Sequence, residues 1–165
     1  MIAGRIRRLP DDARAVAQVA AVFGGAFDLD ALREAGGWHE YEVSDAIDVL
    51  LDHGIVRAGT HLKRPAHAFS HDLIRASIYE QTPEVARRLA HRRAARAIVR
   101  LYPDLRETLA SELAVHYERA GMPAQSAAEY LVAARRANAV FANDDTVRLT
   151  TSGLALEPEL HVRFG

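Results

Sequence analysis

Three consecutive residues near the middle of the chain, Ser70-His71-Asp72, carry side chains that can accept or donate protons. They directly precede an apolar pattern of helical period that begins at Leu73. Ser70 is therefore predicted to be the N-cap of a helix, and Asp72 suits the positive end of the helix dipole. A helix N-terminus and an imidazole N–H are together chemically able to receive a phosphate. Helix capping or packing by His71 is the alternative.

The chain offers few residues for other kinds of chemistry. It contains no cysteine, which excludes disulfides, thiol nucleophiles and thiolate metal sites. His67 and His71 lie four apart, but a strand-to-helix change separates them, so the spacing of a helical metal site does not apply. No serine lies in a G-x-S-x-G motif, and no glycine-rich phosphate-binding loop precedes Lys63, the only lysine. We expect no catalytic residue, no metal site and no cofactor bound by this chain itself.

Arginines recur at spacing four in a predicted helix after Pro83. They are Arg88, Arg92, Arg96 and Arg100, flanked by Arg87 and Arg93. Such a stripe could hold nucleic acid or an acidic partner surface. The alternative is a solvated face with salt bridges to neighbouring acidic helices.

Acidic residues surround an earlier predicted helix over residues 42–53. They are Glu40, Glu42, Asp45, Asp48 and Asp52, with no arginine or lysine between them. Carboxylates repel DNA phosphates, and the basic footprint that drives DNA affinity is missing. We therefore do not expect direct DNA contact by this segment.

The first part of the chain, residues 10–80, is predicted to form a winged-helix-like domain. A helix over 10–23 ends at Gly24-Gly25, and a short helix around Leu32, capped by Asp28 or Asp30, precedes the helix over 42–53. Strands at 55–57 and 67–69 follow, with a loop at 59–66 between them. Three helices followed by a small β-ribbon are typical of a winged helix. Residues 1–9 have no core pattern and are expected to be the tail of a preceding domain or a linker.

Residues 83–157 are predicted to form a tetratricopeptide-like antiparallel helical array. Helices are expected from Pro83 to about 101, over 105–120, over 124–137 and over about 139–156. An alanine-rich pair of these helices, joined by Gly121-Met122-Pro123, resembles one tetratricopeptide unit without its usual tryptophan. The fold class is therefore mainly α. Residues 158–165 are expected to be a frayed C-terminus.

Composition favours a cytoplasmic protein. Hydrophobic residues make up 49% and charged residues 26% of the 165, as in ordinary globular proteins. The most apolar stretch, residues 13–27, is interrupted by Arg14, Gln18 and two glycines, and it is too short to span a bilayer. A net charge of -1 provides no overall attraction to nucleic acid or to an anionic membrane. We expect no membrane partner.

The strings F-S-H-D-L-I-R-A-S-I-Y and A-R-R-L-A-H-R-R-A-A resemble a junction in STAND-class signalling ATPases, including LuxR-type and adenylate-cyclase-associated regulators. The resemblance extends upstream through R-L-P-D-D-A-R-A-V-A-Q-V-A-A-V-F-G-G-A-F-D and downstream through L-A-V-H-Y-E-R-A-G. In that class an ATPase domain is followed by a winged helix and tetratricopeptide-like repeats. The resemblance implies that a full-length relative binds ATP or ADP. It also implies that His71 is a nucleotide-phosphate sensor when an ATPase domain is present. His71 matches the histidine of a Met-His-Asp motif that contacts the phosphate of ADP, and Ser70 replaces the methionine here.

The resemblance implies a non-catalytic regulatory and protein-interaction segment of a signal-transduction ATPase that regulates transcription. The expected partners are an ATPase domain of the same or a longer protein, and a protein partner or small inducer on the helical arm. Two alternatives stay open. One is a DNA-binding transcriptional regulator acting through the arginine-rich helix, and the other is the regulatory part of a multidomain adenylate cyclase.

Overall fold

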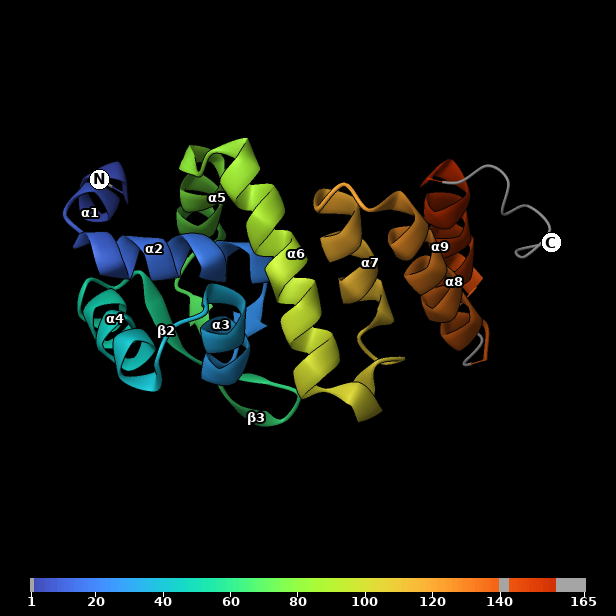
Figure 1. Cartoon of the computed structure of the whole chain (residues 1–165), viewed down its shortest axis with the longest axis horizontal. Helices are drawn as coiled ribbons and strands as arrows, with labels where there is room; N and C mark the ends of the chain where they lie inside the picture. Colours follow the sequence, from blue (N-terminus) through green and yellow to red (C-terminus); the bar gives the residue numbers. More distant parts are fainter. Residues whose placement is uncertain (1, 140–142, 157–165) are drawn as a thin grey trace. The chain divides into compact units, whose positions relative to one another are not determined.

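A computed structural model describes residues 2–139 and 143–156, which are mainly helical with one small antiparallel sheet (Figure 1). The chain divides into two compact units, Met1–Ala97 and Ile98–Gly165. The division falls within helix α6 (Glu84–Leu101), whereas the sequence predicts a domain junction at 80–83. The predicted junction coincides instead with the turn between α5 (Asp72–Gln81) and α6. The junction was predicted from Pro83, because a proline is tolerated at the start of a helix. Such a proline indicates where a helix begins, but it does not show which neighbouring elements the helix packs against.

The first unit contains five helices before α6. They are α1 (Ile2–Arg7), α2 (Asp11–Ala20), α3 (Leu29–Gly36), α4 (Glu40–Asp52) and α5, with a 3-10 turn η1 (Ala21–Phe23) after α2. Of the two possible caps, Asp28 caps α3, accepting a hydrogen bond from the Ala31 N–H at 2.8 Å. Gly37 ends α3 with φ 74°, a conformation that favours glycine. The three predicted helices correspond to α2, α3 and α4, whereas α1 was not predicted.

The sheet has the order β1-β3-β2, formed by Ala26–Phe27, Arg64–Phe69 and Val56–His61 respectively. The loop predicted over 59–66 is wrong, because both strands continue to a two-residue turn at Leu62-Lys63. Both turn residues have positive φ, 51° and 62°. Such turns match the twist of the flanking strands but usually contain Asn or Gly, so the sequence offers no signal for this one.

Strand β1 was not predicted. It pairs with β3, placing Ala26 opposite Ala68 and Phe27 opposite His67. Two residues are too few for an alternating pattern, and the pairing depends on a distant part of the chain. The sheet and the helices enclose a core of large apolar side chains. The largest fully buried ones are Phe27, Leu32, Val43, Leu50, Ile55 and Ile74.

Residues 1–9 form part of the first unit. Helix α1 packs against α5, and the side chains of Ile6 and Leu9 are buried. This differs from the expected tail or linker. Two apolar residues three apart form too short a pattern to be recognised as a core-facing turn.

The second unit contains α7 (Ala110–Arg119), α8 (Pro123–Ala139) and α9 (Asn143–Leu156), and α8 packs against both neighbours. Helix α7 begins five residues after the predicted start at 105, because the chain after Tyr102 first forms the 3-10 turn η2 (Pro103–Leu105). Gly121, with φ 72°, makes the turn between α7 and α8. The predicted frayed segment, 158–165, lies outside the described residues.

Candidate functional site

The Ser70-His71-Asp72 segment joins strand β3 to helix α5. His71 has an extended backbone and is the N-cap residue, so the prediction that Ser70 caps the helix is wrong. The Ser70 N–H donates a hydrogen bond to the Ile55 carbonyl at 2.9 Å. This bond extends the strand by one residue, and the helix therefore begins one residue later than expected.

The side chain of His71 is exposed and makes no hydrogen bond to any residue that the structure describes. Its carbonyl accepts hydrogen bonds from the Ile74 and Arg75 N–H groups at 3.0 and 3.3 Å. The N–H groups of Asp72 and Leu73, in the first turn, have no partner within the helix. An anion at this helix end would meet these two N–H groups and the imidazole, while the Asp72 carboxylate would weaken its binding.

Large apolar side chains are exposed on α5 and α6. Leu73 is 72% exposed, Val85 79% and Leu89 45%. Leu73 begins the apolar pattern that predicted α5, yet its side chain is exposed. The buried positions of α6 in the first unit are mostly alanines, together with His91: Ala90, His91, Ala94, Ala95 and Ala97. Periodicity identified apolar positions correctly, but it does not show whether another element covers them.

Helices α5 and α6 are joined by polar and aromatic contacts. The Tyr79 hydroxyl lies 2.9 Å from His91 Nε2, and the guanidinium of Arg87 lies 5.0 Å from the centre of the Tyr79 ring. Cation–π contacts of this kind stabilise a structure by roughly 0.5–1 kcal/mol at exposed sites. Arg87 and His91 therefore have structural roles at this joint.

His67 lies in β3 and faces Phe27, with ring centres 6.4 Å apart. Its Nδ1 is buried without a hydrogen-bond partner among the described residues. Burial lowers the pKa of His67, and the nearby charge of Asp48 partly opposes this shift. Within residues 2–139 and 143–156, no group of three His, Asp or Glu side chains is placed to hold a metal ion.

The two charged helix faces are both solvent-accessible. The acids of α4, namely Glu40, Glu42, Asp45, Asp48 and Asp52, are all exposed. On α6, Arg88, Arg92, Arg93, Arg96 and Arg100 are exposed, whereas Arg87 is half-buried. Of the two faces, the one on α6 has the charge that nucleic-acid phosphates require.

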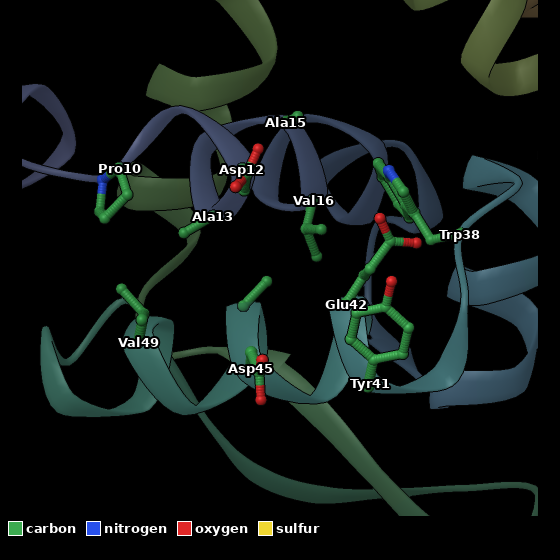
Figure 2. Close-up of a pocket in the computed structure, with 11 residues that line it drawn as sticks. Pro10, Asp12, Ala13, Ala15, Val16, Trp38, Tyr41, Glu42, Asp45 and Val49 are labelled. Atoms are coloured by element: carbon green, nitrogen blue, oxygen red, sulfur yellow. The ribbon is translucent and has the colours of Figure 1, made fainter.

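A cavity of about 360 Å³ lies between α2 and α4. Figure 2 shows Trp38 and Tyr41 at one end of it, Asp12 on the α2 side, and Glu42 and Asp45 on the α4 side. This cavity was not predicted from the sequence. The available signal was the string W-H-E-Y-E after Gly36-Gly37, which places two aromatic residues among acids.

Within the described residues, no helix has the length and apolar character needed to cross a membrane. Comparisons of the chain with protein-family models, curated proteins and solved structures found no match.

Proposed function

We propose that this chain is a non-catalytic regulatory segment of a STAND-type signal-transduction ATPase that controls transcription in the cytoplasm. In this proposal, residues 10–80 are a winged helix, supported by the order of α2, α3, α4 and the β2–β3 hairpin. Residues 83–157 are a tetratricopeptide-like arm, supported by the α7–α8 hairpin at Gly121. An inducer or partner protein binds the arm.

The observation that carries the proposal is the exposed N-terminus of α5. His71 offers an imidazole without a hydrogen-bond partner among the described residues, and Leu73, two residues later, offers an exposed apolar side chain. In an ATPase domain that holds ADP, the phosphate would accept a hydrogen bond from His71, and an apolar surface of the domain would pack against Leu73. The contact to His71 stabilises the inactive state, and ligand binding on the arm favours the state in which this contact is broken.

The first experiment is to sequence the DNA that flanks the reading frame. A phosphate-binding-loop ATPase upstream and further repeats downstream would support the proposal. The longer protein would then be tested with His71→Ala, which removes a hydrogen bond to a charged group that contributes about 1.5–3 kcal/mol. We expect reporter activity without inducer to rise about tenfold or more, and His61→Ala, at the β2–β3 turn, to leave it unchanged. Unrelated genes on both sides would contradict the proposal.

A second candidate function is DNA binding through α6, because four consecutive positions of its arginine stripe are exposed: Arg88, Arg92, Arg96 and Arg100. Binding through this stripe would weaken steeply with salt. Replacing Arg88, Arg92 and Arg96 by Gln would reduce the slope of log affinity against log salt by about 0.9 per lost phosphate contact. Binding that is insensitive to these changes would exclude this function. The same flanking DNA sequence tests the adenylate-cyclase alternative, because a cyclase domain in the longer reading frame would favour it over a transcriptional regulator.

A further inference from the structure

The cavity between α2 and α4 combines aromatic walls with carboxylates. Trp38 and Tyr41 border one end, and in the view of Figure 2 the carboxylate of Glu42 lies between their rings. Asp12 and Asp45 add two more carboxylates from opposite sides. Aromatic faces and carboxylates both attract cations. A planar guanidinium can stack on an aromatic ring while it donates hydrogen bonds to a carboxylate.

The aromatic end of the cavity is held in place by local contacts. A Cβ on Gly36 would overlap the six-membered ring of Trp38, so the indole lies directly against the Gly36 backbone. The Tyr41 ring stacks on His39, with ring centres 5.8 Å apart and an interplanar angle of 7°. The His39 N–H donates to Glu42 Oε2 at 2.7 Å. Because these contacts fix the positions of the aromatic rings and of Glu42, little ordering is needed for binding.

The negative charge of the cavity is not neutralised locally. Asp12 and Asp45 are exposed and have no ion-pair partner among the residues that the structure describes. Three buried side chains, Ala13, Val16 and Ala46, form part of the lining. An apolar lining strengthens the attraction between a carboxylate and a bound cation relative to open water.

We propose that this cavity binds an arginine side chain from a basic segment of a partner protein. The guanidinium stacks against Trp38 or Tyr41 and donates hydrogen bonds to Glu42 and Asp45. Lysine fits less well, because an ammonium group neither stacks nor donates in a planar fork. The charge complementarity of α4, which carries five exposed acids and no base, favours a basic segment as the occupant. This site is independent of His71 and of any nucleotide.

The test uses Trp38, the only tryptophan, as a fluorescent reporter within the cavity. The chain is titrated at low salt with the capped tripeptide Gly-Arg-Gly, and with matched peptides that contain citrulline or lysine instead. We expect a saturable change with arginine, binding at least about tenfold weaker with the neutral isostere citrulline, and intermediate binding with lysine. Asp45→Asn and Asp12→Asn should each weaken arginine binding about two- to fivefold, as for exposed ion pairs.

The matched control is Asp52→Asn, an exposed acid of α4 outside the cavity lining, which should leave the affinity within about a factor of two. Circular dichroism verifies that each variant is folded. The proposal would be overturned if the arginine and citrulline peptides bound equally well. It would also be overturned if the Asp12→Asn/Asp45→Asn double variant bound the arginine peptide as tightly as wild type does. Sedimentation at the same concentrations tests whether the chain self-associates. If the change in Trp38 fluorescence occurred only when dimers formed, the cavity would be assigned to a second copy of the chain, and the partner-protein proposal would be overturned.

Discussion

The two units bury their cores in different ways. In the first unit, large side chains such as Phe27, Leu32 and Leu50 fill the space between the helices and the sheet. In the second unit, Leu109 and Leu113 are buried as well, but one core cluster has only Tyr130 and Leu149 as large members. Its other buried members are alanines: Ala110, Ala114, Ala133, Ala134 and Ala137. Small side chains allow helices to approach closely but leave little apolar area to bury on each residue.

The second unit compensates with buried polar contacts. The Ser126 hydroxyl donates to the Ala114 carbonyl at 2.7 Å, which joins α8 to α7. The carboxylate of Glu129 is 3% exposed and accepts two hydrogen bonds from Arg106, at 2.6 and 3.2 Å. The first unit should therefore be most sensitive to loss of side-chain volume, and the second to added volume and to loss of polar partners.

The largest expected effect is the loss of a core side chain in the first unit. Leu50→Ala removes a fully buried side chain and should lower the free energy of unfolding of that unit by about 3–5 kcal/mol. Trp38 emission during urea unfolding measures this effect, because Trp38 lies in the first unit. Leu29→Ala, on the exposed side of α3, is the control. A loss below about 1 kcal/mol for Leu50→Ala would contradict the proposed difference between the cores.

Breaking the ion pair between Arg106 and the buried Glu129 should have the next largest effect. Arg106→Ala leaves the Glu129 carboxylate buried without its partner and should destabilise the second unit by about 2–3 kcal/mol. This loss is smaller than the loss expected for a fully buried ion pair, because the Arg106 side chain is 57% exposed. Hydrogen exchange of the α7 and α8 amides measures this loss. The double variant Arg106→Met/Glu129→Leu removes both charges and should recover most of it. Equal destabilisation by the single and double variants would show that the ion pair is not responsible.

Added volume distinguishes the two faces of α8. Ala134→Leu introduces a larger side chain at a position that is 3% exposed, and it should destabilise the second unit by about 1–3 kcal/mol. Ala128→Leu makes the same change at an exposed position of the same helix and should be nearly neutral. Amide exchange in α8 measures both. If the two variants were equally stable, the alanine core would not be closely packed.

Alkaline pH should destabilise the second unit through Tyr130. Burial, together with a 2.8 Å hydrogen bond to Glu118, raises the pKa of Tyr130 to about 12. Because the folded pKa lies above the unfolded value of about 10, this contribution to stability is complete below pH 10 and is lost as the pH rises toward 12. Tyr130→Phe should reduce that loss, as measured by urea unfolding at several pH values. An unchanged alkaline profile would contradict the assignment.

The smallest expected effect is acid destabilisation of the first unit through His67. Burial lowers its folded pKa below the usual value of 6.5, so its contribution to stability is complete above that value and is lost as the pH falls through the folded pKa. The comparison of His67→Leu with wild type between pH 7 and pH 5, followed by Trp38 emission, measures this effect. A variant with the same acid sensitivity as wild type would exclude His67 as its source.

Much of the helical framework could be predicted because its signals are local. Gly37, Gly54 and Gly121 follow helix ends and adopt positive φ. The buried residues of α4, among them Val43 and Leu50, follow the 3.6-residue period of a helix. His71 was located at the start of a helix, within one residue of its actual position as the N-cap. These features depend on residues only a few positions apart.

The sequence by itself thus determined where the chain turns and which helix positions are apolar. The tertiary structure decided which apolar positions are covered: Leu73 and Val85 are exposed, although they match a helical pattern as well as Ile74 does. It also decided the pairing of β1 with β3 and the cavity between α2 and α4. The physical reason is that burial, strand pairing and cavities depend on contacts between residues far apart in the chain, which no local pattern specifies.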